Sequence, residues 1–421
     1  MNTAPTGPKQ IRALIGNIPD PEELYGRDDF IEHLWKVIEG NNVLLLAPRR
    51  FGKSGILRHV LKRPHAGFLP LSFELEDVDS SEEFVWRITR ELLVHDGVRR
   101  LLSNARKLPA SLMGWVKDTF DEAEFEGAKV RFKEQIREDW REAAKRMLAE
   151  LEKADETLLF LFDEMPRMIE RISEKRGDES AREFLDWFRT VRLEQKDVLR
   201  RHRFIVAGSV GVDLVLHRLG AVAAFTDFAR LPVEPLDNAP AGQLAEDLAA
   251  SFGITWTPEL SARLFALIGS PVPYFIHIFF SQLGQLPKAS RAALTLDNLD
   301  QVYATRVLGP TCRRYFGHYG SRLTRYGKMG EKSAYAILQA VASRNQVSRP
   351  ALYEIYRKTR GRNADEHEFD ELLADLEYDW YLRLDPGTNE FFFRLKVIQD
   401  WWKRWYPTSA AAAKSARTKQ P

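Results

Sequence analysis

The stretch Asn41-Asn-Val-Leu-Leu-Leu-Ala-Pro-Arg-Arg-Phe-Gly-Lys-Ser-Gly55 decides the fold that this sequence predicts. An apolar run, Val43 to Leu46, leads into a tight turn and then into the helical pattern of Ile56 to Leu61. Strand, loop and helix in this order are typical of a phosphate-binding loop, in which backbone N–H groups at a helix N-terminus converge on an anion. Lys53 would place an ammonium on the β/γ-phosphates, and Ser54 would offer a hydroxyl to Mg²⁺.

The whole loop is therefore a candidate for contact with a nucleotide. Its candidate residues are Ala47, Pro48, Arg49, Arg50, Phe51, Gly52, Lys53, Ser54 and Gly55. The pattern usually opens with glycine, and Ala47 gives up the freedom of positive φ that glycine has. The alternative is a chance Gly-Lys-Ser at an ordinary helix start, but the strand before it and the helix after it favour the phosphate loop.

Composition limits the class of protein. A chain of 421 residues with 44% hydrophobic content can bury large cores and predicts two to three domains. Lys+Arg 62 against Asp+Glu 60 leaves a formal charge of +2, so any surface for nucleic acid must be local. The single cysteine, Cys312, excludes an intrachain disulfide and a cysteine-based zinc site. The sequence shows no signal-peptide core and no apolar run of membrane-spanning length, so we expect a soluble cytoplasmic protein without a membrane partner.

The segment before the loop contains residues that could contact the base of a nucleotide. Tyr25-Gly26-Arg27 precedes a helix in which Phe30, Ile31 and Leu34 recur at helical spacing. Tyr25 could cover an adenine ring, and Arg27 could lie near the phosphates or the ribose. An ordinary N-terminal helix with a turn before it explains the same residues equally well.

A second strand ends in two acids. The run Thr157-Leu-Leu-Phe-Leu-Phe-Asp-Glu164 is apolar enough to be buried on both faces, as in a parallel sheet. Ligands of open α/β sheets bind outside the carboxyl ends of the strands. Asp163 can therefore hold Mg²⁺, and Glu164 can polarise an attacking water. The alternative is that both acids only cap the next helix.

Other strands and helices complete the core. Strands are predicted over 67–75, 203–209 and 227–236, and a charged helical insertion over about 99–153. Ser209 would lie beside the Asp163 strand end, where it could sense a γ-phosphate or position water. It could equally be a simple turn serine.

In their order, these segments resemble the archaeal-type and STAND-like P-loop ATPases, relatives of the AAA+ and origin-recognition ATPases. The matching motifs are Tyr25-Gly-Arg-Asp, Ala47-Pro-Arg-Arg-Phe-Gly-Lys-Ser, Leu159-Phe-Leu-Phe-Asp-Glu, Val206-Ala-Gly-Ser and Gly269-Ser-Pro271. The resemblance, over 18–406, implies an α/β fold with a parallel sheet in the order 5-1-4-3-2, a helical lid and a C-terminal winged helix. It also implies ATP with Mg²⁺ and a glutamate base. Arg49 and Arg50 are candidates for an arginine finger, in the same chain or across a boundary in a homo-oligomer.

The resemblance also divides the chain. We expect a flexible N-terminus over 1–17, the ATPase core over 18–236, the lid over 237–309, a basic and aromatic connector over 310–330, a winged helix over 331–406 and a disordered tail over 407–421. In the lid, Pro271 starts a helix whose N-terminus could face the ribose and phosphates, or it could mark a plain turn.

Two basic segments could bind nucleic acid. They are 313–328, where arginines alternate with aromatic residues, and 357–362. A linker that packs its aromatics explains the first segment better. The third helix of the winged-helix region carries acids from Asp365 to Asp379, which a DNA duplex would repel.

The sequence thus favours an ATP-driven conformational switch or motor, acting on nucleic acid or in a defence or regulatory assembly with an unidentified protein partner. A nucleotide-binding scaffold with little turnover is the second hypothesis. A DNA-binding regulator with an incidental ATPase fold is the third.

Overall fold

The computed structural model describes residues 9–95, 139–142, 144–145, 156–193, 202–208 and 212–406. The chain falls into two compact units. The sheet unit comprises Arg27–Arg49 and Lys53–Val233, and the helical unit comprises Met1–Gly26, Arg50–Gly52 and Glu234–Pro421. The predicted insertion over 99–153 lies almost wholly outside the described residues, and the predicted tail over 407–421 lies entirely outside them.

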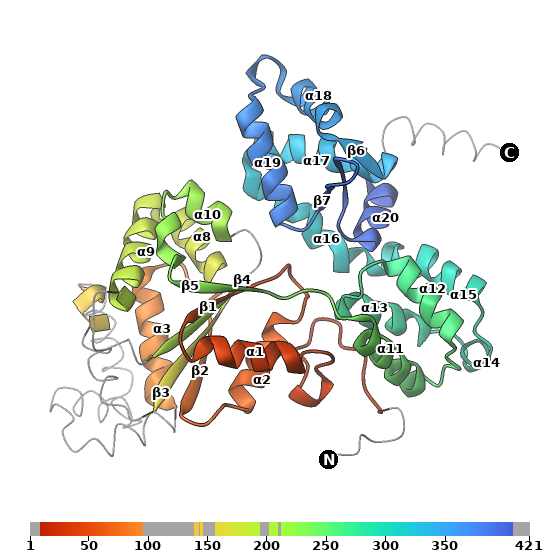
Figure 1. Cartoon of the computed structure of the whole chain (residues 1–421), viewed down its shortest axis with the longest axis horizontal. Helices are drawn as coiled ribbons and strands as arrows, with labels where there is room; N and C mark the ends of the chain where they lie inside the picture. The colour runs from red at the N-terminus through yellow and green to blue at the C-terminus, as the bar shows by residue number, and fades with distance from the viewer. Residues whose placement is uncertain are drawn as a thin grey trace. The chain divides into compact units, whose positions relative to one another are not determined.

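The sheet unit is built on five parallel strands in the order β2-β3-β4-β1-β5 (Figure 1). Their bounds are β1 Asn42–Leu46, β2 Phe68–Glu74, β3 Thr157–Asp163, β4 Arg203–Gly208 and β5 Phe228–Pro232. This is the order 5-1-4-3-2 that the resemblance implied. Because all five strands are parallel, their carboxyl ends meet at one edge, which brings the loop after β1 close to the acids after β3.

Helices flank this sheet (Figure 1). They are α1 Asp28–Ile38, α2 Lys53–Lys62, α3 Ser81–Val94, α8 Met165–Arg176, α9 Asp178–Leu193 and α10 Val212–Arg218. Local signals account for their ends: the Ser80 side chain accepts from the Glu83 N–H at the start of α3, and Gly177 ends α8 with φ 92°.

The core of the sheet unit is aromatic. Phe160 and Phe162 of β3 are 1% and 2% exposed and pack against Phe204 of the neighbouring strand. Phe184 and Phe188 of α9 lie against Phe84 and Phe162, respectively. A strand covered on both faces needs apolar side chains in succession, which explains why β3 reads as an unbroken apolar run.

The helical unit begins with a set of helices that matches the predicted lid in type. They are α11 Asn238–Phe252, α12 Pro258–Ile268, α13 Pro273–Leu283, α14 Lys288–Ala292 and α15 Leu296–Val302, and a π-helical turn, Tyr303–Val307, follows. Among the described residues no single helix is long and apolar enough to span a membrane, although α12 and α13 reach that length and composition as a pair bent by 120°.

An N-terminal segment, which we call the strap (residues 9–25), is tied to these helices. The backbone N–H of Lys9 donates to Asp247 Oδ1 at 3.1 Å, and that of Ile11 to Ser251 Oγ at 2.8 Å. The N–H of Leu14 donates to Nδ1 of His277 at 3.3 Å. Side chains on α11 and α13 therefore supply acceptors for backbone groups that no sheet partner satisfies.

The last part of the helical unit has winged-helix topology. It comprises α17 Gly327–Arg344, β6 Gln346–Ser348, α18 Arg349–Arg360, α19 Glu366–Tyr378, β7 Leu382–Asp385, β8 Glu390–Phe393 and α20 Lys396–Trp405. The three strands form an antiparallel sheet in the order β6-β8-β7. Asp385 shapes the hairpin turn by accepting from the Gly387 N–H at 2.9 Å.

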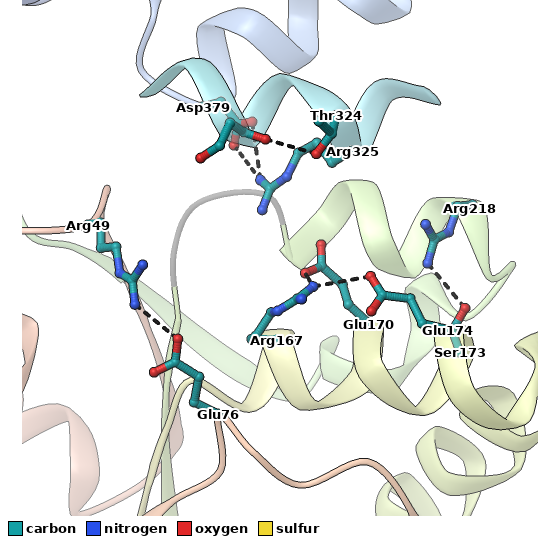
Figure 2. A network of polar contacts seen from close by, with 11 residues as sticks. Arg49, Glu76, Arg167, Glu170, Ser173, Glu174, Arg218, Thr324, Arg325 and Asp379 are labelled. Atoms are coloured by element: carbon teal, nitrogen blue, oxygen red, sulfur yellow. Dashed lines mark hydrogen bonds and ion pairs between the residues drawn. The ribbon is translucent and has the colours of Figure 1, made fainter. Parts of the chain in front are cut away.

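The segment predicted as a connector is helical. It holds α16 (Arg313–Ser321) and the 3-10 helix η5 (Arg322–Tyr326). Arg322 and Arg325 pair with the carboxylate of Asp379, which is 1% exposed, and Tyr326 donates to it at 2.6 Å (Figure 2 shows Arg325 and Asp379). These two arginines neutralise a buried acid, so they are poorly placed to meet nucleic acid.

Candidate functional site

The loop after β1 positions a buried ammonium. Lys53, the first residue of α2, is 5% exposed, and its amine donates to the carbonyls of Ala47 at 2.7 Å and Pro48 at 3.1 Å. The left-handed backbone positions of this loop are Arg50, with φ 77°, and Gly52, with φ 97°. The position that lacks the usual glycine, Ala47, is thus not one of the loop residues that needs positive φ.

Ser54 and Asp163 meet across two elements. The hydroxyl of Ser54, in the first turn of α2, donates to Asp163 Oδ2 at 2.8 Å at the end of β3. Two hard oxygen donors side by side fit Mg²⁺, which in nucleotide sites takes one or two protein ligands together with phosphates and water. Among the described residues, no group of three or more His, Cys, Asp or Glu could hold a metal ion.

Glu164 occupies an unusual backbone position. It has φ 57° and ψ 27°, a left-handed conformation that is uncommon for a residue with a side chain and that clusters at functional sites. It is the N-cap residue of α8, yet its carboxylate makes no capping hydrogen bond within the described chain. The capping alternative considered from the sequence therefore has no support from this side chain.

Close packing fixes the start of α8. Gly208, the last residue of β4, has no room for a side chain, because a Cβ there would lie 2.3 Å from Cγ of Pro166. Pro166 is the second residue of α8, where the absent N–H costs nothing. Gly208 thus lets α8 begin directly against β4, and Glu164 is held next to Asp163.

Four charged groups act on the carboxyl of Glu164. Burial is the main cause that raises the pKa of its carboxyl above the usual value, and the ammonium of Lys53 opposes this most strongly. Asp163 and Glu76 raise the pKa further, whereas Arg49 lowers it. A partly buried acid with a perturbed pKa beside cations is the environment in which a general base is often found.

Arg49 reaches a residue that the sequence did not mark. Its guanidinium donates to Oε1 of Glu76 at 3.0 Å, as Figure 2 shows. Glu76 lies two residues beyond β2, and the only sequence signal for it was an acid near the end of an alternating strand. A second network shown in Figure 2, Arg167 with Glu170 and Glu174, lies on α8 alone.

The remaining candidates are dispersed. Arg27 is buried at the start of α1 in the sheet unit. In the helical unit, the Tyr25 hydroxyl donates to Asp247 at 2.5 Å, and the carbonyl of Pro271 accepts from the Leu236 N–H at 3.0 Å. Ser209 lies outside the described residues. Gly55 is buried in the first turn of α2.

The tip of the loop, Arg50–Gly52, groups with the helical unit. The guanidinium of Arg50 lies 5.0 Å from the ring centroid of Tyr274, and the Phe51 ring, 1% exposed, meets Trp380 edge-on at 4.9 Å. The side chains of Arg50 and Phe51 are thus engaged by aromatic residues.

Comparison with known proteins identifies the fold. No protein-family model matches the chain, and no curated protein matches its sequence. Among solved structures, a Walker-type ATPase of Pyrococcus abyssi is similar with a TM-score of 0.57 and 15% identity, covering 95% of this chain and 99% of that one. The ORC2 protein of Aeropyrum pernix in ADPNP and ADP complexes is similar with a TM-score of 0.54 and 14% identity, covering 97% and 100%. Over nearly its whole length, the chain has the fold of the AAA+ ATPases.

Proposed function

We propose that this protein binds ATP with Mg²⁺ at the carboxyl edge of the sheet unit, hydrolyses it, and uses the cycle as a conformational switch. The observation that carries the proposal is the contact of Ser54 with Asp163, which joins the first turn of α2 to the acid pair at the end of β3. Lys53 on one side and Glu164 on the other complete the set that phosphoryl transfer requires. The relative from Aeropyrum pernix, which shares the fold, is in complexes with ADPNP and ADP, and this accords with ATP as the ligand.

Each side chain has a distinct role in this proposal. Lys53 exchanges its two carbonyl acceptors for phosphate oxygens, because hydrogen bonds between two charged groups are stronger than those to a neutral carbonyl. Ser54 and Asp163 would hold Mg²⁺, which would neutralise phosphate charge. Glu164 accepts the proton of an attacking water, and burial, by raising the pKa of its carboxyl, makes it a better base. The other loop residues, with Tyr25, Arg27, Ser209 and Pro271, remain candidates for contact with the nucleotide.

Binding and turnover must be measured separately, because a scaffold that only binds ATP is the competing function. Lys53→Ala should abolish Mg-ATP binding, and Lys36→Ala, which removes an exposed lysine from α1, is the matched control. Undiminished affinity in a folded Lys53→Ala protein would overturn the site. Binding without turnover above background by the unaltered protein would favour the scaffold.

A nucleic-acid role belongs to the basic residues of α18 and the turn after it. Lys358 and Arg362 are exposed, whereas two connector arginines are engaged by Asp379. We propose 357–362 as the segment that would meet nucleic acid, with 313–328 contributing through its exposed Arg313 and Arg314. Assembly into a homo-oligomer, an unidentified protein partner and a cytoplasmic location complete the proposal.

A further inference from the structure

The ion pair of Arg49 with Glu76 spans the edge where we place the phosphates. Arg49 follows β1, and Glu76 follows β2, with β3 and β4 between these two strands in the sheet. Neighbouring strands lie about 4.8 Å apart, so the loop and the arginine together bridge roughly 14 Å. The Leu75 N–H donates to the carbonyl of Asp163 at 3.1 Å, which keeps the end of β2 beside the acid pair. The pair thus reaches past the end of β3.

The ion pair is weak enough to exchange. The side chains of Arg49 and Glu76 are 46% and 60% exposed, and pairs of this kind contribute little to stability. Within the part of the chain that the structure describes, Glu76 is the ion-pair partner of Arg49. A planar guanidinium matches phosphate in two-point geometry and gains more from it than from one carboxylate oxygen.

The local charge balance favours that exchange. Two cations, Lys53 and Arg49, and two carboxylates, Asp163 and Glu76, act electrostatically on Glu164. Both members of the ion pair are among these four groups. While Glu76 is bound to Arg49, it competes with a phosphate group for the same guanidinium. The competition is strongest for the phosphate that carries the most charge.

We infer that Glu76 is a positioning residue that holds Arg49 beside the strand ends and yields it to the terminal phosphate of a nucleoside triphosphate. The inference rests on the proposed function and deepens it, because it makes the pair a determinant of ATP over ADP. Arg49 then binds the triphosphate more than the diphosphate, and Glu76 lowers that preference by competing for Arg49.

Equilibrium affinities for Mg-ATP and Mg-ADP test this without any turnover. Glu76→Gln should raise the ATP:ADP affinity ratio by about threefold to fivefold, the range expected from releasing an exposed ion pair. Glu76→Asp keeps the charge and should keep the ratio. Asp77→Asn is the matched control, because Asp77 is the next acid in the chain but pairs with Arg87 of α3 at 2.9 Å. It should leave the ratio unchanged.

Replacing Arg49 should change the ATP:ADP affinity ratio in the opposite direction. Arg49→Gln should lower ATP affinity by about tenfold and ADP affinity by less, since a charge-assisted contact to the terminal phosphate is lost. In the Arg49→Gln background, Glu76→Gln should no longer raise the ratio. An equal rise in that background would mean that Glu76 only repels phosphate, and equal losses of ATP and ADP in both single variants would mean a structural ion pair. Either result overturns the inference.

Failure of the proposed function looks different. If the unaltered protein binds neither nucleotide, both proposals fall. If it binds ATP, Lys53→Ala does not, and Glu76→Gln leaves the ratio unchanged, only the inference falls. Unfolding temperatures without nucleotide verify that the variants fold, and Arg49→Lys provides a conservative replacement with the charge retained.

Discussion

The hydroxyl of Ser54 lies 2.8 Å from the carboxylate of Asp163, although 109 residues separate them in the chain. A parallel sheet makes this contact possible, because β1 and β3 end at the same edge with only β4 between them. The same edge carries Glu164, so the residues proposed to hold the metal and to activate water are adjacent by construction of the sheet. Mutations here should separate binding from chemistry.

Glu164→Gln should separate ATP binding from ATP hydrolysis. The amide retains the size of the side chain but cannot accept a proton, so ATP affinity should persist while phosphate release falls by about 10²- to 10⁴-fold. Phosphate release under saturating ATP measures the loss, and equilibrium binding verifies the affinity. Glu170→Gln is the control, because Glu170 lies on the same helix α8 and pairs with Arg167 at 3.0 Å. Unchanged phosphate release in Glu164→Gln would rule out Glu164 as the base.

Gly208→Ala should disturb the start of α8. An added methyl group would lie 2.3 Å from Pro166, so either α8 or β4 must move, at a cost of about 1–3 kcal/mol in the free energy of unfolding. Gly40→Ala is the control, since a Cβ at Gly40 would meet nothing within 4 Å. Urea unfolding of the two variants tests this. Equal stability of both would show that α8 can shift without cost.

His277 should make the helical unit sensitive to acid. Burial lowers its pKa to about 4, well below the usual value of about 6.5. Between these values the unfolded chain takes up a proton that the folded chain refuses, so stability falls as the pH drops through 6.5 toward 4. The loss in the free energy of unfolding that is due to His277 reaches at most about 3 kcal/mol at the low end of this pH range.

Urea unfolding midpoints at pH 7.5 and pH 5 test how much His277 contributes to the pH dependence of stability. His277→Gln should lose less stability between these pH values than the unaltered protein does. His367→Gln, at a side chain that is 84% exposed, serves as the control and should behave like the unaltered protein. Parallel losses in all three proteins would contradict the prediction.

DNA binding, where it occurs, should depend on α18 and not on α19. Lys358→Glu with Arg362→Glu should weaken salt-sensitive DNA retention and reduce its salt slope by about two. Asp370→Ala with Glu371→Ala should not weaken it, because Asp370 already pairs with Arg349 and both acids repel phosphate. If the Asp370→Ala, Glu371→Ala double variant lost sequence-specific DNA binding while the domain stayed folded, α19 would be the helix that contacts the bases.

Patterns along the chain predicted the sheet order and the acid pair after β3, because buried strands leave long apolar runs and the resemblance fixed their arrangement. They did not predict Glu76, since an exposed acid beyond a strand looks like any solvated residue until a distant arginine reaches it. Nor did they predict the ion pairs made by the segment that was expected to be a connector. Arg322 and Arg325 both donate to Asp379, which lies 57 and 54 residues further along the chain, and no local pattern predicts a pairing over that distance.

The contacts of the strap constrain the order in which the protein folds during synthesis. Lys9 finds its acceptor in Asp247 after 238 further residues, and Leu14 finds His277 after 263. At ribosomal rates of about 5–20 residues per second, these amides wait for roughly 10–50 s. The sheet unit, which ends at Val233, is fully synthesised before the first of these acceptors exists. Nascent chains should therefore expose the strap to proteases and chaperones until α13 has left the ribosome.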